Sequence, residues 1–342
     1  MNVAEPIERG RSDPPAAVVR AGLAEVEAST RAGLVRVEHA LNAAVQSSDE
    51  FIRGAATTLI DAGGKRFRPT CVLLAGHFGD PDEPALIPAA VAVELTHLSS
   101  LYHDDVIDEA ELRRGVPSVN TRHGNHVAIL TGDYLFARAS EITADLGQES
   151  SRILARTIAR LTQGQIGDVR GPSDGKDPVE HYMWVLSEKT GALIGTACRL
   201  GGLLSGAKPD EVEALTEFGE RLGVAFQLAD DLLDIAQDES SSGKLPGTDL
   251  REGVRTLPVL YLLRARGRGS DVVERVLDAD EPDEGAVGEA LDVLRGSQAF
   301  EDARGAAAAQ VELARESLDR LPDIPARAAL EEVARRVLDR DR

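Results

Sequence analysis

The stretch that decides the fold and the expected chemistry is Leu101 to Gly115, which reads LYHDDVIDEAELRRG. Asp104 and Asp108 stand four residues apart near the end of a predicted long helix, so they share one face, with Asp105 beside them. Carboxylates this close repel one another, and desolvation adds to the cost, so a bound cation is expected. Hard oxygen ligands favour Mg²⁺. The alternative is an acidic helix end that is merely solvated.

A second copy of the motif favours the metal site over that alternative. Residues 226–234 read FQLADDLLD and supply Asp230, Asp231 and Asp234. They lie inside another apolar helical pattern, where solvated acids are not expected. Two such clusters suit a site for two or three metal ions that faces a diphosphate.

Composition limits the classes of partner. The chain has 342 residues, 42% of them hydrophobic, which is enough for a globular core with a sizeable cavity. Its 58 acidic and 38 basic residues give a net charge of −20, which argues against nucleic acid or an anionic membrane surface. Cys71 and Cys198 form no disulfide framework or metal-ligand spacing, which fits a reducing cytoplasm. No apolar run approaches a bilayer span, so a soluble protein without a transmembrane segment is expected.

Basic residues form a second kind of site. Residues 63–69, GGKRFRP, place three cations on a glycine loop ahead of a new helix, an arrangement typical of anion binding. The alternative is a glycine C-cap with a solvated basic turn. Arg113 and Arg114 are suited to bidentate phosphate contacts, or they form a basic helix end. His97, two turns before Asp104, is either a core histidine or a ligand-binding residue.

Helical periodicity runs through most of the chain and predicts an all-α protein of about a dozen helices. One helix is expected over residues 85–108, and others over 126–146 and 151–169. No alternating strand pattern and no solenoid repeat is present. We expect residues 1–15 to be a disordered tail and residues 16–342 a single all-α domain. Residues 238–252, which are polar and rich in Ser and Gly, are interpreted as a mobile lid loop.

Five segments, in the same order, resemble the trans-isoprenyl diphosphate synthase (polyprenyl synthetase) family. Residues 63–69 resemble its GGKRxRP box, residues 104–115 its first aspartate-rich motif with RRG, and residues 189–191 its KTG. Residues 226–234 resemble the second aspartate-rich motif, and residues 243–258 the GKxxGxDLxEGxxTLP segment. The resemblance covers nearly all of the chain after residue 50. It implies a bundle of mostly antiparallel helices around a deep central cavity, usually homodimeric, with both acidic motifs at its mouth.

The resemblance also implies a reaction and residue roles. The enzyme would condense isopentenyl diphosphate with an allylic diphosphate primer, through ionisation and a carbocation, to a trans-polyprenyl diphosphate. By resemblance, three Mg²⁺ ions would be held against the allylic diphosphate by Asp104, Asp105, Asp108, Asp230, Asp231 and Asp234. Isopentenyl diphosphate would be held by Lys65, Arg68, His97 and Arg114, with Gly64 in the same substrate-binding loop. The allylic diphosphate would contact Arg113, Lys189 and Lys244, while Thr190 and Gln227 would present dipoles to the carbocation.

One position departs from the family pattern. Where the EGKxTLP segment often carries Lys, this chain has Val254, followed by Arg255. Arg255 is the candidate to replace the missing diphosphate contact.

Product length is expected to depend on the residues one turn before Asp104. In the family, aromatic side chains there give short products, but this chain has Ser99 and Ser100, and Thr96, Val93 and Ala89 follow down the same face. Because a helical turn advances about 5.4 Å, roughly one extended isoprene unit, we expect a product of about C30 to C50. Tyr134 and Phe136, on another predicted helix, are the alternative floor.

Other functions remain as alternatives. A shorter-chain farnesyl or geranylgeranyl diphosphate synthase would differ only in cavity depth. A class I terpene cyclase has no use for isopentenyl diphosphate, so the GGKRFRP box argues against it. A non-catalytic partner subunit would predict eroded acidic motifs, and both motifs are intact.

Overall fold

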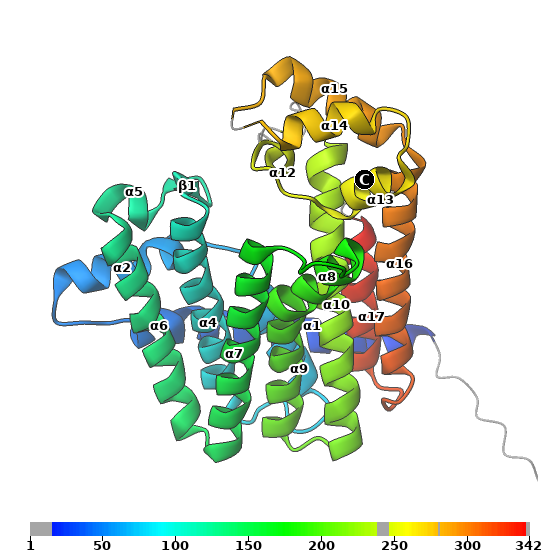
Figure 1. Cartoon of the computed structure of the whole chain (residues 1–342). Helices are drawn as coiled ribbons and strands as arrows, with labels where there is room; N and C mark the ends of the chain where they lie inside the picture. The colour runs from blue at the N-terminus through cyan, green and yellow to red at the C-terminus, as the bar shows by residue number, and fades with distance from the viewer. Residues whose placement is uncertain (1–15, 238–245, 280, 340–342) are drawn as a thin grey trace, which may run out of the picture.

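The computed structural model describes residues 16–237, 246–279 and 281–339, which are almost entirely helical (Figure 1). The expected all-α fold is confirmed. The expected tail at residues 1–15 and the expected diphosphate ligand Lys244 lie outside the described residues. The helices are α1 (Ala16–Ala44), α2 (Glu50–Asp61), α3 (Phe67–Gly76), α4 (Leu86–Ile107), α5 (Val119–His123), α6 (Asn125–Asp145), α7 (Gln148–Arg170), α8 (Pro178–Leu186), the π-helical segment η1 (Ser187–Gly191), α9 (Ala192–Ser205), α10 (Pro209–Ala236), α12 (Thr248–Arg251), α13 (Leu257–Ala265), α14 (Ser270–Leu277), α15 (Glu284–Arg295), α16 (Gln298–Leu318) and α17 (Pro325–Leu338).

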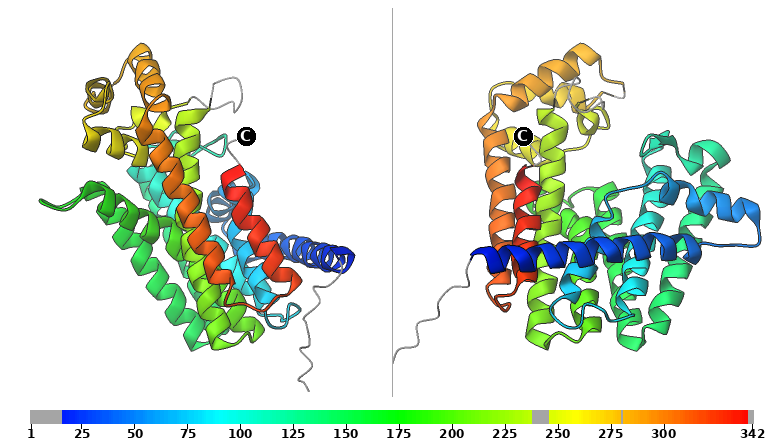
Figure 2. Two further views of the ribbon diagram at one scale, coloured as in Figure 1. Left: turned by 90° about the vertical axis from the view of Figure 1, so that its right-hand side faces the viewer. Right: turned by 180° about the vertical axis from the view of Figure 1, so that it is seen from behind.

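The long helices form a bundle in which α4 packs on α6, and α10 packs on both α9 and α16 (Figure 1). Helix α1 runs crosswise behind this bundle and contacts α3, α4 and α17 (Figure 2). Helices α12, α14 and α15 lie together beyond one end of α10 (Figure 1). Among the described helices, none combines the length and the apolar character needed to cross a bilayer.

Helix α10 shows why these residues form these elements. Its apolar stripe, which includes Leu215, Phe218 and Leu222, is fully buried between α9 and α16. The helix begins at Pro209, and the Glu211 carboxylate accepts the Lys208 backbone N–H at 3.0 Å. The second acidic motif therefore lies at the end of a firmly packed helix.

Small residues let the chain around α9 approach its neighbours closely. A Cβ atom at Gly201 would lie 2.2 Å from the Val72 carbonyl oxygen, and one at Gly223 would lie 2.7 Å from the Gly191 Cα atom. This close packing holds η1 directly against α10.

A short hairpin follows α4, where no strand was expected. Strand β1 (Leu112–Arg113) pairs antiparallel with β2 (Val116–Pro117). Arg114 and Gly115 form the two-residue turn with φ values of 54° and 76°, as the primed hairpin turns require. Two-residue strands are too short to produce an alternating pattern, so the sequence could not indicate them. The hairpin directs Arg113 toward Asp105 and Arg114 toward the loop that contains Gly63.

Hydrophobic side chains form two clusters. The larger one joins α1, α3, α4, α6, α9 and α10, and it contains both free cysteines, Cys71 and Cys198. The smaller one joins α13 to α16 with the end of α10 that carries the second acidic motif. The two acidic motifs thus belong to helices with different surroundings.

Candidate active site

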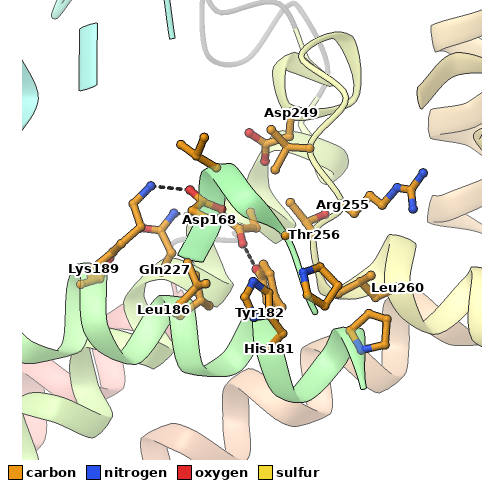
Figure 3. Close-up of a pocket in the computed structure, with 18 of the residues that line it drawn as sticks. Asp168, His181, Tyr182, Leu186, Lys189, Gln227, Asp249, Arg255, Thr256 and Leu260 are labelled. Carbon is orange, nitrogen blue, oxygen red and sulfur yellow. Dashed lines mark hydrogen bonds and ion pairs between the residues drawn. The ribbon is translucent and has the colours of Figure 1, made fainter. Parts of the chain in front are cut away.

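A cavity of about 1360 Å³ opens between α4, α7, α8, α10 and the segment after α12 (Figure 3). It gathers side chains from motifs that are far apart in the sequence. Those singled out from the sequence that line it are Arg68, His97, Ser100, Asp104, Asp108, Arg113, Lys189, Thr190, Gln227, Asp231, Val254 and Arg255. Those that belong to the same motifs but not to the lining are Gly64, Lys65, Asp105, Arg114, Asp230 and Asp234.

The first acidic motif presents Asp104 and Asp108 to the cavity. Burial raises the pKa of Asp104 to about 6, and the neighbouring Asp108 charge adds to the rise, while Lys189 opposes it. Burial raises the pKa of Asp108 as well. These carboxylates are held close together without enough positive charge, which is the situation that a bound cation relieves.

Asp105 is not part of the cavity lining and points toward Arg113 instead. It is buried, and its Oδ1 accepts a hydrogen bond from Arg113 Nε at 2.6 Å. Its Oδ2 is buried as well and has no hydrogen-bond partner among the described residues. Asp105 therefore orients Arg113, which lines the cavity.

The second acidic motif divides its three carboxylates between different partners. Asp231 lines the cavity and accepts hydrogen bonds from the Tyr182 hydroxyl and, at 2.9 Å, from Gln227 Nε2. Asp234 accepts the backbone N–H groups of Thr248 and Asp249, each at 3.1 Å, and so anchors the start of α12. Asp230 is exposed next to them. Part of the expected lid, residues 248–251, is thus the helix α12, while residues 238–245 lie outside the described residues.

Asp249 is a site residue that we did not single out from the sequence. It lines the cavity, and burial raises its pKa to about 8, with further contributions from Asp231 and Asp234. Its only signal was its place in the segment that resembles GKxxGxDL. That position becomes meaningful only when the chain folds back onto Asp234.

The basic residues form a cluster around His97. Arg68 and His97 line the cavity, and the Nε atom of Arg68 is buried without a hydrogen-bond partner in the described part of the chain. Burial holds the pKa of His97 well below its usual range, and the charges of Arg68 and Arg114 lower it further. A buried, unpartnered guanidinium edge beside a neutral histidine is suited to receive an anion.

Arg114 and the glycine loop support this cluster from outside the cavity. Arg114 Nη1 donates to the Leu59 carbonyl oxygen at 2.9 Å and to that of Gly63. A Cβ atom at Gly64 would lie 3.0 Å from Arg114 Nη1, so only glycine fits here without displacing the guanidinium. Lys65 is exposed.

Lys189 and Thr190 lie on η1, and π-helical turns of this kind recur at functional sites. Lys189 Nζ lies 2.5 Å from Asp168 Oδ2, as Figure 3 shows. Thr190 Oγ1 donates to Gln227 Oε1 at 3.3 Å. Asp168 and Tyr182 were not assigned from the sequence, because no local spacing connects them to Lys189 or Asp231.

The expectation that Arg255 replaces the missing family lysine stays a prediction. Arg255 lines the cavity, but its Nη2 is 3.6 Å from Asp278 Oδ1, on the far side of the cavity from Lys189 (Figure 3). Val254 is a partly exposed lining residue.

The helix face expected to guide the product is only partly open. Ser100 lines the cavity, whereas Ser99 is buried and its Oγ donates to the Gly132 carbonyl oxygen at 2.7 Å. The expectation that Ser99 faces the channel is wrong, because Ser99 and Ser100 project about 100° apart around the helix. Thr96, Val93 and Ala89 are fully buried.

The aromatic residues of α6 point elsewhere. The Tyr134 hydroxyl donates to the Gln46 carbonyl oxygen at 3.4 Å, and the Phe136 ring centroid lies 5.6 Å from that of His103. Neither is part of the cavity lining.

The carboxylates that line the cavity are suited to a divalent cation. Within residues 16–237, 246–279 and 281–339, no three His, Cys, Asp or Glu side chains converge into a closed metal site. Asp104 and Asp108 approach from α4, and Asp231 and Asp249 from the other side of the cavity. Mg²⁺ commonly binds one or two carboxylates together with substrate phosphates and water, which this open arrangement allows.

Comparison with known proteins agrees with this geometry. Residues 49–294 match the family model described as Polyprenyl synthetase. The chain is 47% identical over 320 residues to the nonaprenyl diphosphate synthase of Mycobacterium tuberculosis, covering 92% of this chain and 96% of that one.

Two solved structures superpose over nearly the whole chain. Geranylgeranyl pyrophosphate synthase from Corynebacterium glutamicum, complexed with calcium and isoprenyl diphosphate, has a TM-score of 0.83 at 41% identity, with coverage of 92% of this chain and 97% of that one. Polyprenyl synthase from Caulobacter crescentus, with the same kinds of ligand, has a TM-score of 0.86 at 32% identity, with coverage of 94% and 98%. The resemblance seen in the sequence is confirmed, and the chain is a prenyltransferase that belongs to the polyprenyl synthetase family.

Proposed function

We propose that this prenyltransferase condenses isopentenyl diphosphate with an allylic diphosphate primer to give a trans-polyprenyl diphosphate. The observation that carries the proposal is that carboxylates of both acidic motifs and the basic cluster around His97 line one cavity of about 1360 Å³. The two sets of charge are suited to two different diphosphates. The carboxylates would bind one diphosphate through metal ions, and the basic side chains would bind the other directly.

The residues of the first set would hold the primer. We assign Asp104, Asp108, Asp230, Asp231 and Asp234 to Mg²⁺, with Asp105 acting through Arg113. Mg²⁺, when bound, would neutralise the charge that develops on the departing diphosphate. Lys189, Arg113 and, by family resemblance, Lys244 would bind the same diphosphate. By family resemblance, these five carboxylates would hold three ions.

The second set would bind isopentenyl diphosphate. Arg68 and His97 offer donors inside the cavity. By family resemblance, Arg114, Gly64 and Lys65 would complete this subsite, and Arg114 donates to the Gly63 carbonyl oxygen of the same loop. Between the two diphosphates, the Thr190 and Gln227 dipoles would face the forming carbocation. No nucleophilic side chain is required, because the double bond of isopentenyl diphosphate attacks and the released diphosphate can take the proton.

For chain length we propose a product of about C30 to C50, although Ser100 is the one residue of the expected helix face that lines the cavity. The identity to a nonaprenyl diphosphate synthase supports a long product. The alternative is a geranylgeranyl-length product, which the identity to the Corynebacterium enzyme and the closed packing of Val93 favour. A terpene cyclase is disfavoured by the family match.

We also propose that the enzyme works as a homodimer in the cytoplasm. A group of exposed apolar side chains on α2 and α6 is suited to a second copy: Phe51, Ile52, Ile129 and Leu130. Two buried free cysteines fit a reducing compartment. Multi-angle light scattering would measure the mass, and a monomer at micromolar concentration would contradict the dimer.

The function is tested by incubating the protein with labelled isopentenyl diphosphate, MgCl₂ and one allylic primer at a time. Chromatography of the products then gives activity and chain length together. We expect elongation of geranyl, farnesyl or geranylgeranyl diphosphate and loss of activity in EDTA. Release of cyclic hydrocarbons without incorporation of label would overturn the proposal in favour of a cyclase.

A further inference from the structure

A chain of hydrogen bonds crosses the cavity wall from α8 to η1 through α10. The Tyr182 hydroxyl donates to Asp231 Oδ2, and Gln227 Nε2 donates to Asp231 Oδ1 at 2.9 Å. Gln227 Oε1 in turn accepts from Thr190 Oγ1 at 3.3 Å. All four side chains line the cavity.

This series of hydrogen bonds fixes the orientation of the Asp231 carboxylate and that of the Gln227 amide, which a single contact could not do. Each oxygen of the Asp231 carboxylate has its own donor, so the carboxylate plane is held from both sides. The Gln227 amide has its NH₂ group on Asp231 and its oxygen on Thr190, so its dipole has one direction. Reversing the amide would place the Gln227 oxygen against the Asp231 carboxylate, so that two acceptors would face each other.

Within this series of hydrogen bonds, the position of Tyr182 is set by contacts of its own helix, which lie outside the acidic motifs. Its helix α8 begins with Pro178 and is capped by Asp177, whose carboxylate accepts the Val179 N–H at 2.9 Å. His181 Nε2 lies 3.0 Å from the Gly167 carbonyl oxygen, which ties α8 to α7. The Tyr182 ring packs against the smaller hydrophobic cluster. A rigid ring on an anchored helix is suited to hold a carboxylate at a constant place.

We propose that Tyr182 is a positioning residue of the prenyl transfer reaction: it holds the Asp231 carboxylate for cation binding and, through Asp231, sets the direction of the Gln227 dipole. This inference rests on the proposed function. Tyr182 acts on the primer side of the cavity, since the donors assigned to isopentenyl diphosphate, Arg68 and His97, belong to a separate cluster. The role therefore predicts an effect on metal dependence and turnover with little effect on the binding of isopentenyl diphosphate.

The test is Tyr182→Phe, which removes one hydroxyl and keeps the ring. Because hydrogen-bond partners of metal ligands typically contribute about 10- to 100-fold, we expect kcat to fall at least about tenfold and the MgCl₂ concentration for half-maximal rate to rise several-fold. KM for isopentenyl diphosphate should stay within about twofold of the wild type on the same grounds. Tyr261→Phe is the matched control, because Tyr261 packs against the same cluster but does not line the cavity.

A double-mutant cycle separates positioning from a general structural effect. If Tyr182 acts through Asp231, Tyr182→Phe should cost little more once Asp231→Asn is present. Independent, multiplicative losses would overturn the proposal, and so would wild-type metal dependence in Tyr182→Phe. A parallel fall of kcat, melting temperature and affinity for both substrates would indicate a structural role only.

A binding measurement keeps the inference separate from the proposed function. The melting temperature is recorded with and without MgCl₂ plus inorganic diphosphate for the wild type, Tyr182→Phe and Tyr261→Phe. We expect the stabilisation to be smaller in Tyr182→Phe alone. If no protein elongates any primer but this difference is present, the proposed function fails and the positioning of Asp231 stands. If the three proteins gain equal stability, the positioning role fails.

Discussion

At the scale of single residues, the site is defined by which charged groups have partners. Asp105 gives one oxygen to Arg113, and Asp234 gives both oxygens to the backbone of α12. Asp104 and Asp108 face the cavity with raised pKa values caused mainly by burial. Carboxylates that look equivalent in the two motifs therefore have different roles: some hold other parts of the protein in place, and others face the cavity.

Asp104→Asn is expected to abolish most turnover while the protein stays folded. The substitution removes a cavity-facing charge that is destabilising in the metal-free protein, so the apo melting temperature should be unchanged or slightly higher. We expect at least about a 100-fold loss of kcat. Product formation and metal-free thermal unfolding would be measured on the same preparation. Wild-type turnover would contradict the assignment of Asp104 to a cation.

Arg68→Ala is expected to raise KM for isopentenyl diphosphate more than Lys65→Ala does. Arg68 lines the cavity, and its Nε has no hydrogen-bond partner among the described residues, whereas Lys65 is exposed and is not part of the lining. A charge-assisted hydrogen bond contributes roughly 1.5–3 kcal/mol, so KM should rise about ten- to 100-fold in Arg68→Ala. Steady-state kinetics with each substrate varied in turn would decide. A larger effect on the primer would mean that the two diphosphate subsites are exchanged.

At the scale of elements, the sequence was a good guide to helices and a poor guide to directions around them. The helix expected at residues 85–108 is α4, from Leu86 to Ile107, because a long apolar stripe fixes both its type and its length. The direction of Ser99 depends on the close approach of α6 at Gly132, and that of Asp105 on a hairpin of two-residue strands. Neither contact leaves a periodic signal in the sequence. The place of Asp249 in the site depends on a contact of the same kind, the hydrogen bond from its backbone N–H to Asp234, and could not be predicted from the sequence either.

Ser100→Phe is the prediction that belongs to α4. Ser100 lines the cavity about one helical turn before Asp104, so an aromatic ring there should stop elongation early and shift products to about C15 to C20. The first condensation should keep its rate, because both diphosphate clusters are untouched. Overpacking costs about 1–3 kcal/mol where space is short, so thermal unfolding is recorded alongside chromatography.

Ser99→Ala is the matched control for that substitution, because its hydroxyl is bonded to Gly132 rather than facing the cavity. Its product distribution should equal that of the wild type. An unchanged distribution in an active Ser100→Phe enzyme would show that this part of the wall does not touch the growing chain.

At the scale of the whole molecule, the excess of acidic over basic residues is the feature that matters most for stability. The net charge is −20, and carboxylates from α4, α10 and α12 meet at one cavity while α1 and the bundle hold them in place. The folded protein therefore keeps together groups that would separate if the chain unfolded. This makes stability depend on pH and on bound cations.

The metal-free protein is expected to lose stability as pH rises from about 4 to 8. The folded-state pKa is about 6 for Asp104 and Asp231 and about 8 for Asp249, in each case above the ordinary carboxyl value. A folded state that binds protons more tightly than the unfolded chain gains stability at low pH and loses it as pH rises through the folded pKa.

Asp249→Asn isolates one part of this effect. Between pH 6 and 8 the wild type should lose on the order of 1–2 kcal/mol relative to the variant, since one pKa unit corresponds to about 1.4 kcal/mol. Urea unfolding in EDTA at both pH values measures the difference. Parallel pH dependence in the two proteins would contradict a buried, protonated Asp249.

The raised pKa of Asp249 also allows its carboxyl group to bind and release a proton near neutral pH. At neutral pH this carboxyl keeps its proton, next to Asp231 and Asp234. Cations bound there would favour the ionised form, so binding of cations and diphosphate is expected to release that proton to the solvent, and their departure to take a proton back. Ligand binding is in this way expected to depend on pH.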